Sequence, residues 1–364
     1  MKKRKICMVA GEASADRHAA AVIRALKDIM PGVEVFGMGG PAMAEAGMEC
    51  IYGIHGFSVM GFSDVIPRIR HIHSVYRGLR GAVRERRPEV VVPVDLPDFN
   101  MRLAGALKRS GFKILYYIAP QAWAWRRYRA RTLSRTTDGL AVIFPFEEAF
   151  FSSFGVNARY VGHPLVEEES ARIPPGRWPP EKIALLPGSR LHEIRTILPV
   201  MIQAKRLVQR QYPHIAWHIP VAPGIDPAIV ASLADPDIEL ASQVQPADLA
   251  VVKSGTSSFE MALRGIPEII CYRTSELNYR LARAFVRIDR IGMPNIVLGR
   301  PAVPELIQGE LTPERLAREM VKIIEDRQRY VQMQESFDEM RRLLGDASPS
   351  RGVAAWIADM TERA

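Results

Sequence analysis

The chain has few cysteines and no long hydrophobic run, and both absences narrow its class. Its three cysteines are far apart and form no CxxC pair, which argues against a disulfide framework or a zinc cage. No apolar stretch is long enough to span a bilayer. The short apolar run near the start is followed at once by Glu12 and Asp16, so it is a better match to a first β-strand than to a signal peptide. We therefore expect a protein of the cytosol or of a membrane surface.

Several familiar catalytic signatures are also missing. There is no GxGxxG motif and no Walker loop, so NAD binding is weakly supported and a P-loop is excluded. There is no HExxH or facial-triad spacing and no GxSxG elbow, which leaves metal chemistry and serine-hydrolase chemistry without support. We expect no metal and no cofactor.

What is present is the composition of a globular α/β protein. The 364 residues are 48% hydrophobic and 24% charged, enough for two domains with substantial cores. Strand-like runs alternate with helix-like runs, as in doubly wound α/β folds. The four prolines between residues 170 and 181 indicate a linker. We predict Rossmann-like domains at 1–168 and 182–340 with a cleft between them, and a helical tail at 341–364.

Two polar clusters follow strands in the first half. Asp95, Asp98 and Asn100 come after the apolar run 90–94, and a second run, 113–117, leads to a segment with aromatic and arginine side chains: Gln121, Trp123, Trp125 and Arg126. The carboxyl ends of neighbouring strands are where open α/β sheets bind ligands. Rings beside guanidinium groups suit a ligand that is part apolar and part anionic. The alternative is a core strand that runs into an aromatic turn.

The first predicted strand also ends in a turn with binding potential. Gly11 allows a tight turn, Ser14 is a good helix N-cap, and backbone N–H groups there could meet a ligand oxygen. A simple capped turn explains the same residues.

Two turns of the second half resemble phosphate sites. Gly188, Ser189 and Arg190 follow the strand that ends at Leu186, with Ser189 as a candidate helix cap and Arg190 as a two-donor phosphate ligand. The second turn holds Ser254, Gly255 and Thr256 and is followed by Glu260, which could accept hydrogen bonds from a ribose diol. Two such turns in one domain favour a nucleotide-diphosphate site.

The net charge of +9 is clustered in arginines. Seven lie between Arg68 and Arg87, and five lie between Arg126 and Arg135. Such patches attract nucleic acid, anionic lipid or phosphorylated ligands. The predicted helix 64–86 has apolar residues at helical spacing and is either a core helix with a solvated arginine face or an interfacial helix, in which Phe62, Ile66 and Ile69 would enter the membrane. A nucleic-acid-binding module is disfavoured because no RNP, KH or helix-turn-helix signature accompanies the charge.

Taken together and in this order, the motifs resemble the lipid-A-disaccharide synthase family over nearly the whole chain. The motifs are 11–16, 59–61, 95–100, 120–126, 162–164 (Gly-His-Pro), 186–190, 254–256 with Glu260, and 294–295 (Pro-Asn). One departure is Ala15, where the family usually has glycine.

The resemblance implies a GT-B fold and a metal-independent, inverting transfer. UDP-2,3-diacylglucosamine and 2,3-diacylglucosamine 1-phosphate would give the β-1′,6-linked tetraacyl disaccharide 1-phosphate and UDP. Asp95 is the expected general base, with Asp98 and Glu12 next in line, and Met60 and Asn295 join the expected acceptor-binding and nucleotide-binding residues respectively. The expected location is the cytoplasmic face of the inner membrane, whose anionic surface would be a binding partner. A homodimer is possible, and we expect no nucleic-acid partner. A UDP-sugar epimerase or a GT-B transferase with a water-soluble acceptor is the alternative enzyme.

Overall fold

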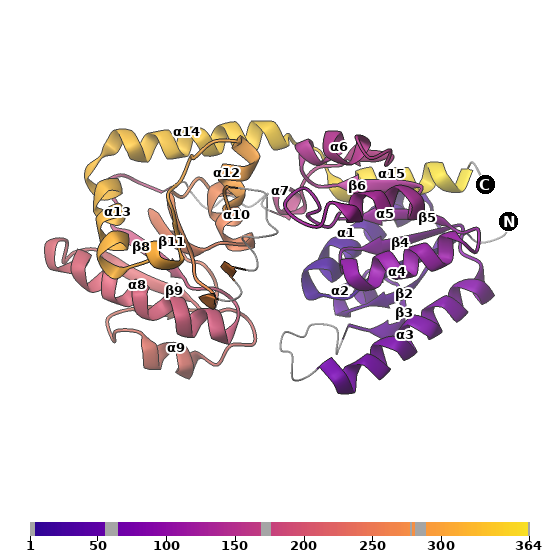
Figure 1. Cartoon of the computed structure of the whole chain (residues 1–364), viewed down its shortest axis with the longest axis horizontal. Helices are drawn as coiled ribbons and strands as arrows, with labels where there is room; N and C mark the ends of the chain where they lie inside the picture. The colour runs from indigo at the N-terminus through magenta and orange to yellow at the C-terminus, as the bar shows by residue number, and fades with distance from the viewer. Residues whose placement is uncertain (1–3, 55–64, 169–175, 277–278, 281–288, 363–364) are drawn as a thin grey trace. The chain divides into compact units, whose positions relative to one another are not determined.

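The computed structural model describes residues 4–54, 65–168, 176–276, 279–280 and 289–362, with the backbone alone for 65–69. The chain divides into two compact units (Figure 1). Unit 1 comprises residues 1–167 and 344–364, and unit 2 comprises residues 168–343. Both contain a parallel sheet covered by helices, which confirms the two-domain, Rossmann-like α/β fold.

The sheet of unit 1 has the strand order β3-β2-β1-β4-β5-β6-β7. Its strands are β1 (Lys5–Ala10), β2 (Glu34–Gly39), β3 (Glu49–Gly53), β4 (Val90–Val94), β5 (Lys113–Tyr117), β6 (Gly139–Val142) and β7 (Ala158–Tyr160). The helices are α1 (Ala13–Ile29), α2 (Pro41–Glu45), α3 (Val65–Arg86), α4 (Pro97–Lys108), α5 (Tyr128–Thr136), α6 (Pro145–Ser152), α7 (Pro164–Glu168, at the unit boundary) and α15 (Pro349–Glu362).

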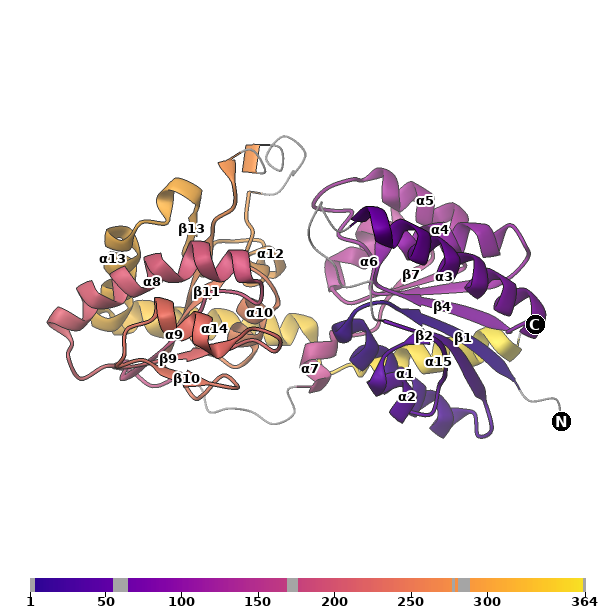
Figure 2. The same ribbon diagram turned by 90° about the horizontal axis from the view of Figure 1, so that it is seen from below.

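Both faces of this sheet are covered, which is why its central strands are apolar throughout. Along β1, Ile6 and Met8 pack with α1 and α15 on one face, whereas Cys7 and Val9 pack with α3 and α4 on the other. Figure 2 shows α1 and α2 on one side of the sheet and α3, α4 and α5 on the opposite side. Burial on both faces raises the pKa of the Cys7 thiol to about 12, so this cysteine is an inert core residue.

The sheet of unit 2 has the order β10-β9-β8-β11-β12-β13. Its strands are β8 (Lys182–Leu186), β9 (Ala216–Pro220), β10 (Glu239–Ala241), β11 (Leu249–Lys253), β12 (Glu268–Tyr272) and β13 (Glu305–Ile307). The helices are α8 (Leu191–Gln211), α9 (Pro227–Leu233), α10 (Thr256–Leu263), α12 (Met293–Leu298), the 3₁₀ turn η2 (Gln308–Glu310), α13 (Pro313–Glu325) and α14 (Arg327–Leu344).

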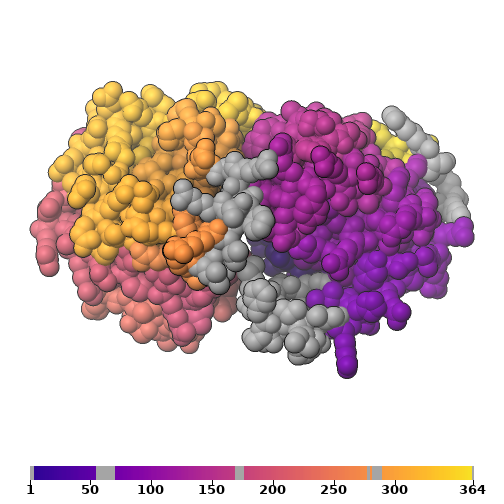
Figure 3. Space-filling model, in the orientation of Figure 1, coloured from indigo at the N-terminus to yellow at the C-terminus, as the bar shows by residue number. Residues whose placement is uncertain are grey.

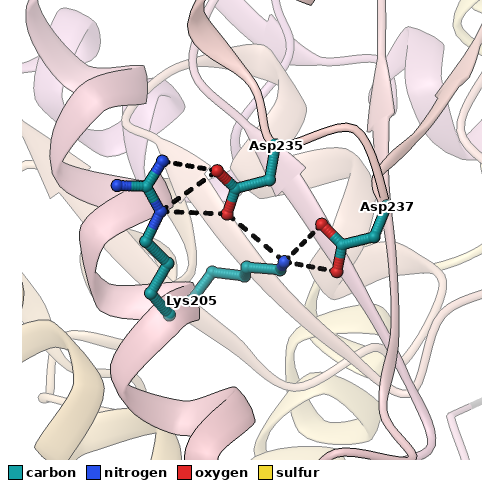
Figure 4. A network of polar contacts seen from close by, with 4 residues as sticks. Lys205, Asp235 and Asp237 are labelled. Carbon is teal, nitrogen blue, oxygen red and sulfur yellow. Dashed lines mark hydrogen bonds and ion pairs between the residues drawn. The ribbon is translucent and has the colours of Figure 1, made fainter.

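A buried lysine ties α8 to the segment before β10. Lys205 is almost fully buried, and its Nζ lies 2.5 Å from an Asp237 carboxylate oxygen and 3.3 Å from one of Asp235 (Figure 4). Arg206 forms a second ion pair with Asp235 at 2.5 Å. The buried ammonium therefore has the charged partners that it needs.

The predicted tail, 341–364, does not form a single element. Helix α14 continues through Leu344, and α15 packs against α1 in the core of unit 1. Figure 3 shows the yellow C-terminal part of the chain, which includes α14 and α15, at the surface of both units. Among the residues that the structure describes, no helix has the length and hydrophobicity of a membrane span.

Candidate functional site

The strand order of the unit 1 sheet reverses between β1 and β4: the chain adds β2 and β3 on one side of β1, and β4 to β7 on the other. Two predicted carboxylates follow β1 and β4. Glu12 comes two residues after β1, and Asp95 comes directly after β4. At this position in an open α/β sheet, the connections from neighbouring strands leave toward opposite faces, and the carboxyl ends form the binding edge. The structure therefore brings Glu12 and Asp95 to one edge.

The backbone at Asp95 is held in an uncommon conformation. Asp95 and Leu96 have φ values of +50° and +49°. The Asp95 N–H donates to the carbonyl of Tyr117 at 2.9 Å, and the Asp95 carbonyl accepts from the Tyr116 hydroxyl at 2.7 Å. Left-handed backbone at non-glycine residues is costly and persists where surrounding contacts fix it. The strand end is therefore a rigid support for the carboxylate.

The surroundings of the Asp95 carboxylate shift its pKa toward neutrality. Burial, and then the negative charge of Glu12, raise the pKa of Asp95 to about 6. A carboxylate of this kind is a better proton acceptor than an exposed aspartate and is still ionised at pH 7.

Asn100 supports this strand end from inside the fold. Its side chain is fully buried, and Nδ2 donates to the carbonyls of Val9 (3.2 Å), Val94 (3.1 Å) and Asp95 (2.8 Å). Asn100, which was predicted to contact the acceptor, has no exposed side-chain surface in this structure. It joins the ends of β1 and β4 instead.

Asp98 lies in the first turn of α4 and forms ion pairs with two arginines. Its side chain is 81% exposed and pairs with Arg129 at 2.5 Å and with Arg126 at 3.9 Å. The guanidinium groups of Arg126 and Arg129 lie 4.2 and 5.6 Å from the centre of the Trp125 ring. The sequence did not single out Arg129, a buried cation that joins α4 to the aromatic turn.

The predicted aromatic turn, 121–126, is compact and partly exposed. The Gln121 carbonyl accepts from the Ala124 and Trp125 N–H groups, and the Gln121 side chain is exposed. Trp125 is 37% exposed, whereas Trp123 is half-buried and its Nε1 donates to Glu147 at 3.0 Å. The turn thus presents one ring outward and anchors the other.

The predicted role of Ser14 as an N-cap is wrong. Helix α1 begins at Ala13 with Glu12 in the cap position, and no side chain caps it. Ser14 is exposed within the first turn. The neighbouring Asp16 is buried and accepts from the N–H groups of Gly40, Ala42 and Met43 at the start of α2, so it is a structural residue.

Part of the predicted site is not described. Met60 and Phe62 lie outside the described residues, and of Ile66 and Ile69 only the backbone in α3 is described.

Unit 2 contains a pocket of about 440 Å³ at the carboxyl ends of β8, β9 and β10, beside the start of α10. Of the predicted nucleotide residues, it includes Gly188, Ser189 and Glu260. Ser257, the last residue of the turn 254–257 that was predicted to hold a phosphate, also lines it. The sequence did not identify the rest of the lining, chiefly 220–223 and 242–244, together with Arg264. Glu260 pairs with Arg264 at 2.5 Å on the pocket wall.

A buried carboxylate organises the loop at Arg190. Helix α8 begins at Leu191 with Arg190 in the cap position, so the prediction that Ser189 caps it is wrong. Instead, the Glu193 side chain accepts from the Ser189 N–H at 3.2 Å and pairs with Lys253 at 2.9 Å and Arg190 at 3.3 Å. Burial alone would raise the pKa of Glu193, but these partners, Lys253 foremost, lower it overall.

Gly188 is required by this arrangement. Its φ is +121°, and a Cβ there would lie 2.5 Å from a Glu193 carboxylate oxygen. Two cationic side chains, Arg190 and Lys253, are thereby held at the ends of β8 and β11, where an anionic ligand would be bound.

The second predicted phosphate turn joins β11 to α10. Gly255 occupies the cap position of α10 with φ +154°, and Thr256 is its first residue. The Ser254 hydroxyl donates to the carbonyl of Ile291 at 2.9 Å. The backbone N–H groups at the start of α10 remain suited to a phosphate.

Asn295, which was predicted to bind nucleotide, is held inside the fold by hydrogen bonds to its neighbours. The side chain is 1% exposed. Its Nδ2 donates to the Val303 carbonyl (2.9 Å) and to Glu305 (2.7 Å), and its Oδ1 accepts from the N–H groups of Ala302 (2.7 Å) and Val303 (2.9 Å). An amide side chain has two donor hydrogens and two acceptor positions, so none is left for a ligand.

Among the described residues, no group of three or more histidine, cysteine or acidic side chains could hold a metal ion.

Solved structures with this fold include sugar-nucleotide enzymes. The calicheamicin glycosyltransferase CalG4 has a TM-score of 0.65 at 15% identity, covering 100% of this chain and 99% of its own. The UDP-GlcNAc 2-epimerase from Neisseria meningitidis, solved bound to UDP-GlcNAc, has a TM-score of 0.65 at 11% identity and covers 98% and 100%. At such identities the likeness supports the GT-B-type fold alone.

Sequence comparison identifies the family. The family model described as lipid-A-disaccharide synthetase matches residues 6–353. The lipid-A-disaccharide synthase of Anaeromyxobacter dehalogenans (strain 2CP-1) is 40% identical, covering 96% of each chain, and that of Myxococcus xanthus is 38% identical, covering 98% of this chain and 97% of its own. The chain therefore belongs to the lipid-A-disaccharide synthase family of glycosyltransferases.

Proposed function

We propose that Asp95 is the general base with which this glycosyltransferase forms the lipid A disaccharide. Family membership implies a UDP-sugar and a phosphorylated sugar as substrates, and we take these to be UDP-2,3-diacylglucosamine and 2,3-diacylglucosamine 1-phosphate. The acceptor 6-hydroxyl attacks C1 of the donor sugar from the face opposite UDP. Its proton passes to Asp95, and the electron pair of the breaking C1–O bond leaves with UDP.

The main support for Asp95 as the general base is its environment. It lies at the switch point of the sheet in unit 1, on a strand end that Tyr116 and Asn100 fix, with a pKa raised to about 6. Asp98 is a weaker candidate because two guanidinium groups already pair with it. Glu12 contributes through its charge, which helps to raise the pKa of Asp95.

We place the UDP part of the donor in the pocket of unit 2. Arg190 would contact the diphosphate, the turn 254–257 a phosphate, and Glu260 the ribose. This agrees with the cations at the ends of β8 and β11 and with Glu260 on the pocket wall. These groups would stabilise the charge that develops on the leaving diphosphate. The N. meningitidis epimerase, with the same fold, was solved with a UDP-sugar bound.

For the acceptor, we propose the turn 121–126 of unit 1. The exposed face of Trp125 suits an apolar portion of the substrate, and Arg126, also exposed, suits its phosphate.

The product test is mass spectrometry of the full chain incubated with the acylated donor and acceptor. A disaccharide 1-phosphate that carries both pairs of acyl chains is expected. Transfer to unacylated glucosamine 1-phosphate at an equal rate would favour the soluble-acceptor alternative, and a donor epimer without transfer would favour an epimerase. A nucleic-acid-binding role is not favoured, because the family is enzymatic.

We also propose that the enzyme docks on the anionic cytoplasmic face of the inner membrane through the segment 57–62 and helix α3. Exposed arginines of α3, including Arg70 and Arg77, would each add about 1 kcal/mol on anionic lipid, less in high salt. Both substrates are amphiphiles, so docking avoids moving whole acyl chains through water.

Liposome flotation tests this proposal with a variant in which Phe62, Ile66 and Ile69 are all serine. The wild type should float with anionic vesicles, and the folded variant should remain at the bottom of the density gradient. Val75, Leu79 and Val83 of α3 already pack in the core of unit 1. A folded variant that still floats would place the docking surface elsewhere, and an unfolded one would show that Phe62, Ile66 and Ile69 belong to that core as well. Light scattering on the same preparation tests for the homodimer.

A further inference from the structure

Glu147 is a buried acid of unit 1 to which the proposed mechanism gives no task. It lies in α6 and is 1% exposed, and it follows Phe144 and Phe146, whose rings stack on one another. One oxygen accepts from Trp123 Nε1 at 3.0 Å. The other accepts from the backbone N–H groups of Ile143 (3.2 Å) and Phe144 (3.1 Å). Every partner is a donor, which favours the ionised carboxylate. Burial outweighs these bonds and raises the pKa of Glu147 to about 7, so the group is ionised above neutral pH.

These hydrogen bonds join two loops that follow neighbouring strands. Ile143 and Phe144 come directly after β6, and Trp123 lies in the turn after β5. Within that turn, hydrogen bonds to the Gln121 carbonyl from Ala124 and Trp125 keep it compact, so the orientation of Trp123 sets that of the next residues. Trp125 and Arg126, the proposed acceptor contacts, follow within three positions.

The Gly-His-Pro motif at 162–164 contributes to the same cluster. The His163 ring is buried and lies 4.9 Å from that of Phe144, which in turn stacks on Phe146 at 5.6 Å. Phe146 meets Trp123 edge-on at 5.1 Å. Burial lowers the pKa of His163 to about 3, so this histidine is neutral and packs as a ring. The anchor of Trp123 is thus one hydrogen bond to a buried acid within an aromatic cluster.

We propose that Glu147 is a positioning residue for acceptor binding: by holding the Trp123 indole, it fixes the turn 121–126 that presents Trp125 and Arg126. The inference rests on the proposed function, because it takes this turn as the acceptor site. It assigns no chemical step to Glu147.

Two variants remove the same hydrogen bond from opposite ends. Glu147→Gln keeps the size of the side chain, but its amide group cannot accept from all three donors. Trp123→Phe keeps an aromatic ring against Phe146 and deletes the N–H together with the five-membered ring that carries it. Tyr160→Phe is the matched control, since it also removes one side-chain donor in unit 1, from the bond to the Leu344 carbonyl at 2.6 Å.

Steady-state kinetics with both acylated substrates should separate acceptor binding from general damage. Glu147→Gln and Trp123→Phe should each lower kcat/KM for the acceptor by about tenfold, the scale of a hydrogen bond to a charged group. The donor KM and the UDP affinity should remain as in the wild type, and the double variant should be no worse than the poorer single one. Tyr160→Phe should transfer normally. Unchanged acceptor kinetics, an equal loss for the donor, or losses that multiply would overturn the proposal.

An activity-independent measurement keeps this test separate from the proposed reaction. The chain has five tryptophans, and Trp123→Phe identifies which indole N–H signal in a ¹⁵N spectrum belongs to Trp123. Glu147→Gln should shift that signal while leaving the others in place. An unshifted signal refutes the contact itself, whereas a shifted signal in an enzyme that makes no disaccharide would refute the proposed function alone. Trp123→Phe retains the two backbone bonds of Glu147 and so keeps the test valid if Glu147→Gln does not fold.

Discussion

Replacing Asp95 with Asn should make the protein less active and more stable at the same time. Burial and Glu12 raise the pKa of Asp95 from 3.8 to about 6. Because a tenfold change in proton affinity equals about 1.4 kcal/mol, ionised Asp95 lowers the free energy of unfolding of unit 1 by up to about 3 kcal/mol. The folded state binds the proton more tightly, so this loss is absent below about pH 4 and complete above about pH 6.

Asparagine removes the charge and tolerates the same backbone. It is among the residues most often found with positive φ, so the φ of +50° adds no strain. At pH 8 the variant should therefore gain stability, by up to about 3 kcal/mol, and the gain should vanish as the pH falls toward 4. Turnover should fall about a hundredfold or more, with UDP binding intact. In the wild type, kcat/KM should decline below about pH 6, as the base becomes protonated.

Denaturant unfolding of the full chain at pH 8 and pH 5, with turnover measured on the same preparations, provides the assay. Asp98→Asn is the matched control: Asp98 is exposed and pairs with two arginines, so its removal should give no such gain. An Asp95→Asn protein that is no more stable than the wild type at pH 8 would refute the electrostatic reasoning. Near-normal turnover would transfer the role of base to another carboxylate.

Three further changes test other parts of the structure. Arg190→Ala should weaken UDP binding by about 1.5–3 kcal/mol, and calorimetry that finds unchanged affinity would remove Arg190 from the site. Lys205→Met should lower the free energy of unfolding by about 1–3 kcal/mol at pH 7, because two carboxylates lose a buried partner. Arg206 lowers the pKa of Asp235, and Lys205 lowers that of Asp237. The loss of stability should therefore shrink in acid, as both carboxylates become protonated. Asn295→Ala should reduce the free energy of unfolding by about 2–4 kcal/mol, since it leaves several buried polar groups unpaired. The UDP affinity of the folded protein, measured by calorimetry, should not fall.

The sequence predicted the architecture because a parallel sheet imposes a strong pattern. The run from Ile6 to Ala10 is apolar, follows a basic segment and ends at Gly11, and it lies in β1, Lys5–Ala10. The strands β3 and β13 have no long apolar run that would mark them in the sequence, because the first is a partly exposed edge and the second has three residues.

The candidate site was predictable only in part. Asp95 could be placed because a polar residue directly after a buried strand must lie at the binding edge. The roles of Asn100 and Asn295 could not be inferred, since a sequence does not show whether the partners of an amide are a ligand or the backbone. Glu147 was missed because its partner Trp123 is 24 residues away and nothing local marks the pair.

The packing of α15 on α1 has a consequence for synthesis. Val353, Ala354 and Ile357 are fully buried in the same core cluster as α1 and β1, yet the ribosome makes them only after all of unit 2. Unit 2 is continuous in the chain and can fold as it emerges, whereas unit 1, which contains Asp95, must wait with the apolar surface of α1 uncovered. The half of the enzyme that is translated first is therefore completed last, and a ribosome that stalls before residue 349 would release a chain whose N-terminal core is still open to chaperones and proteases.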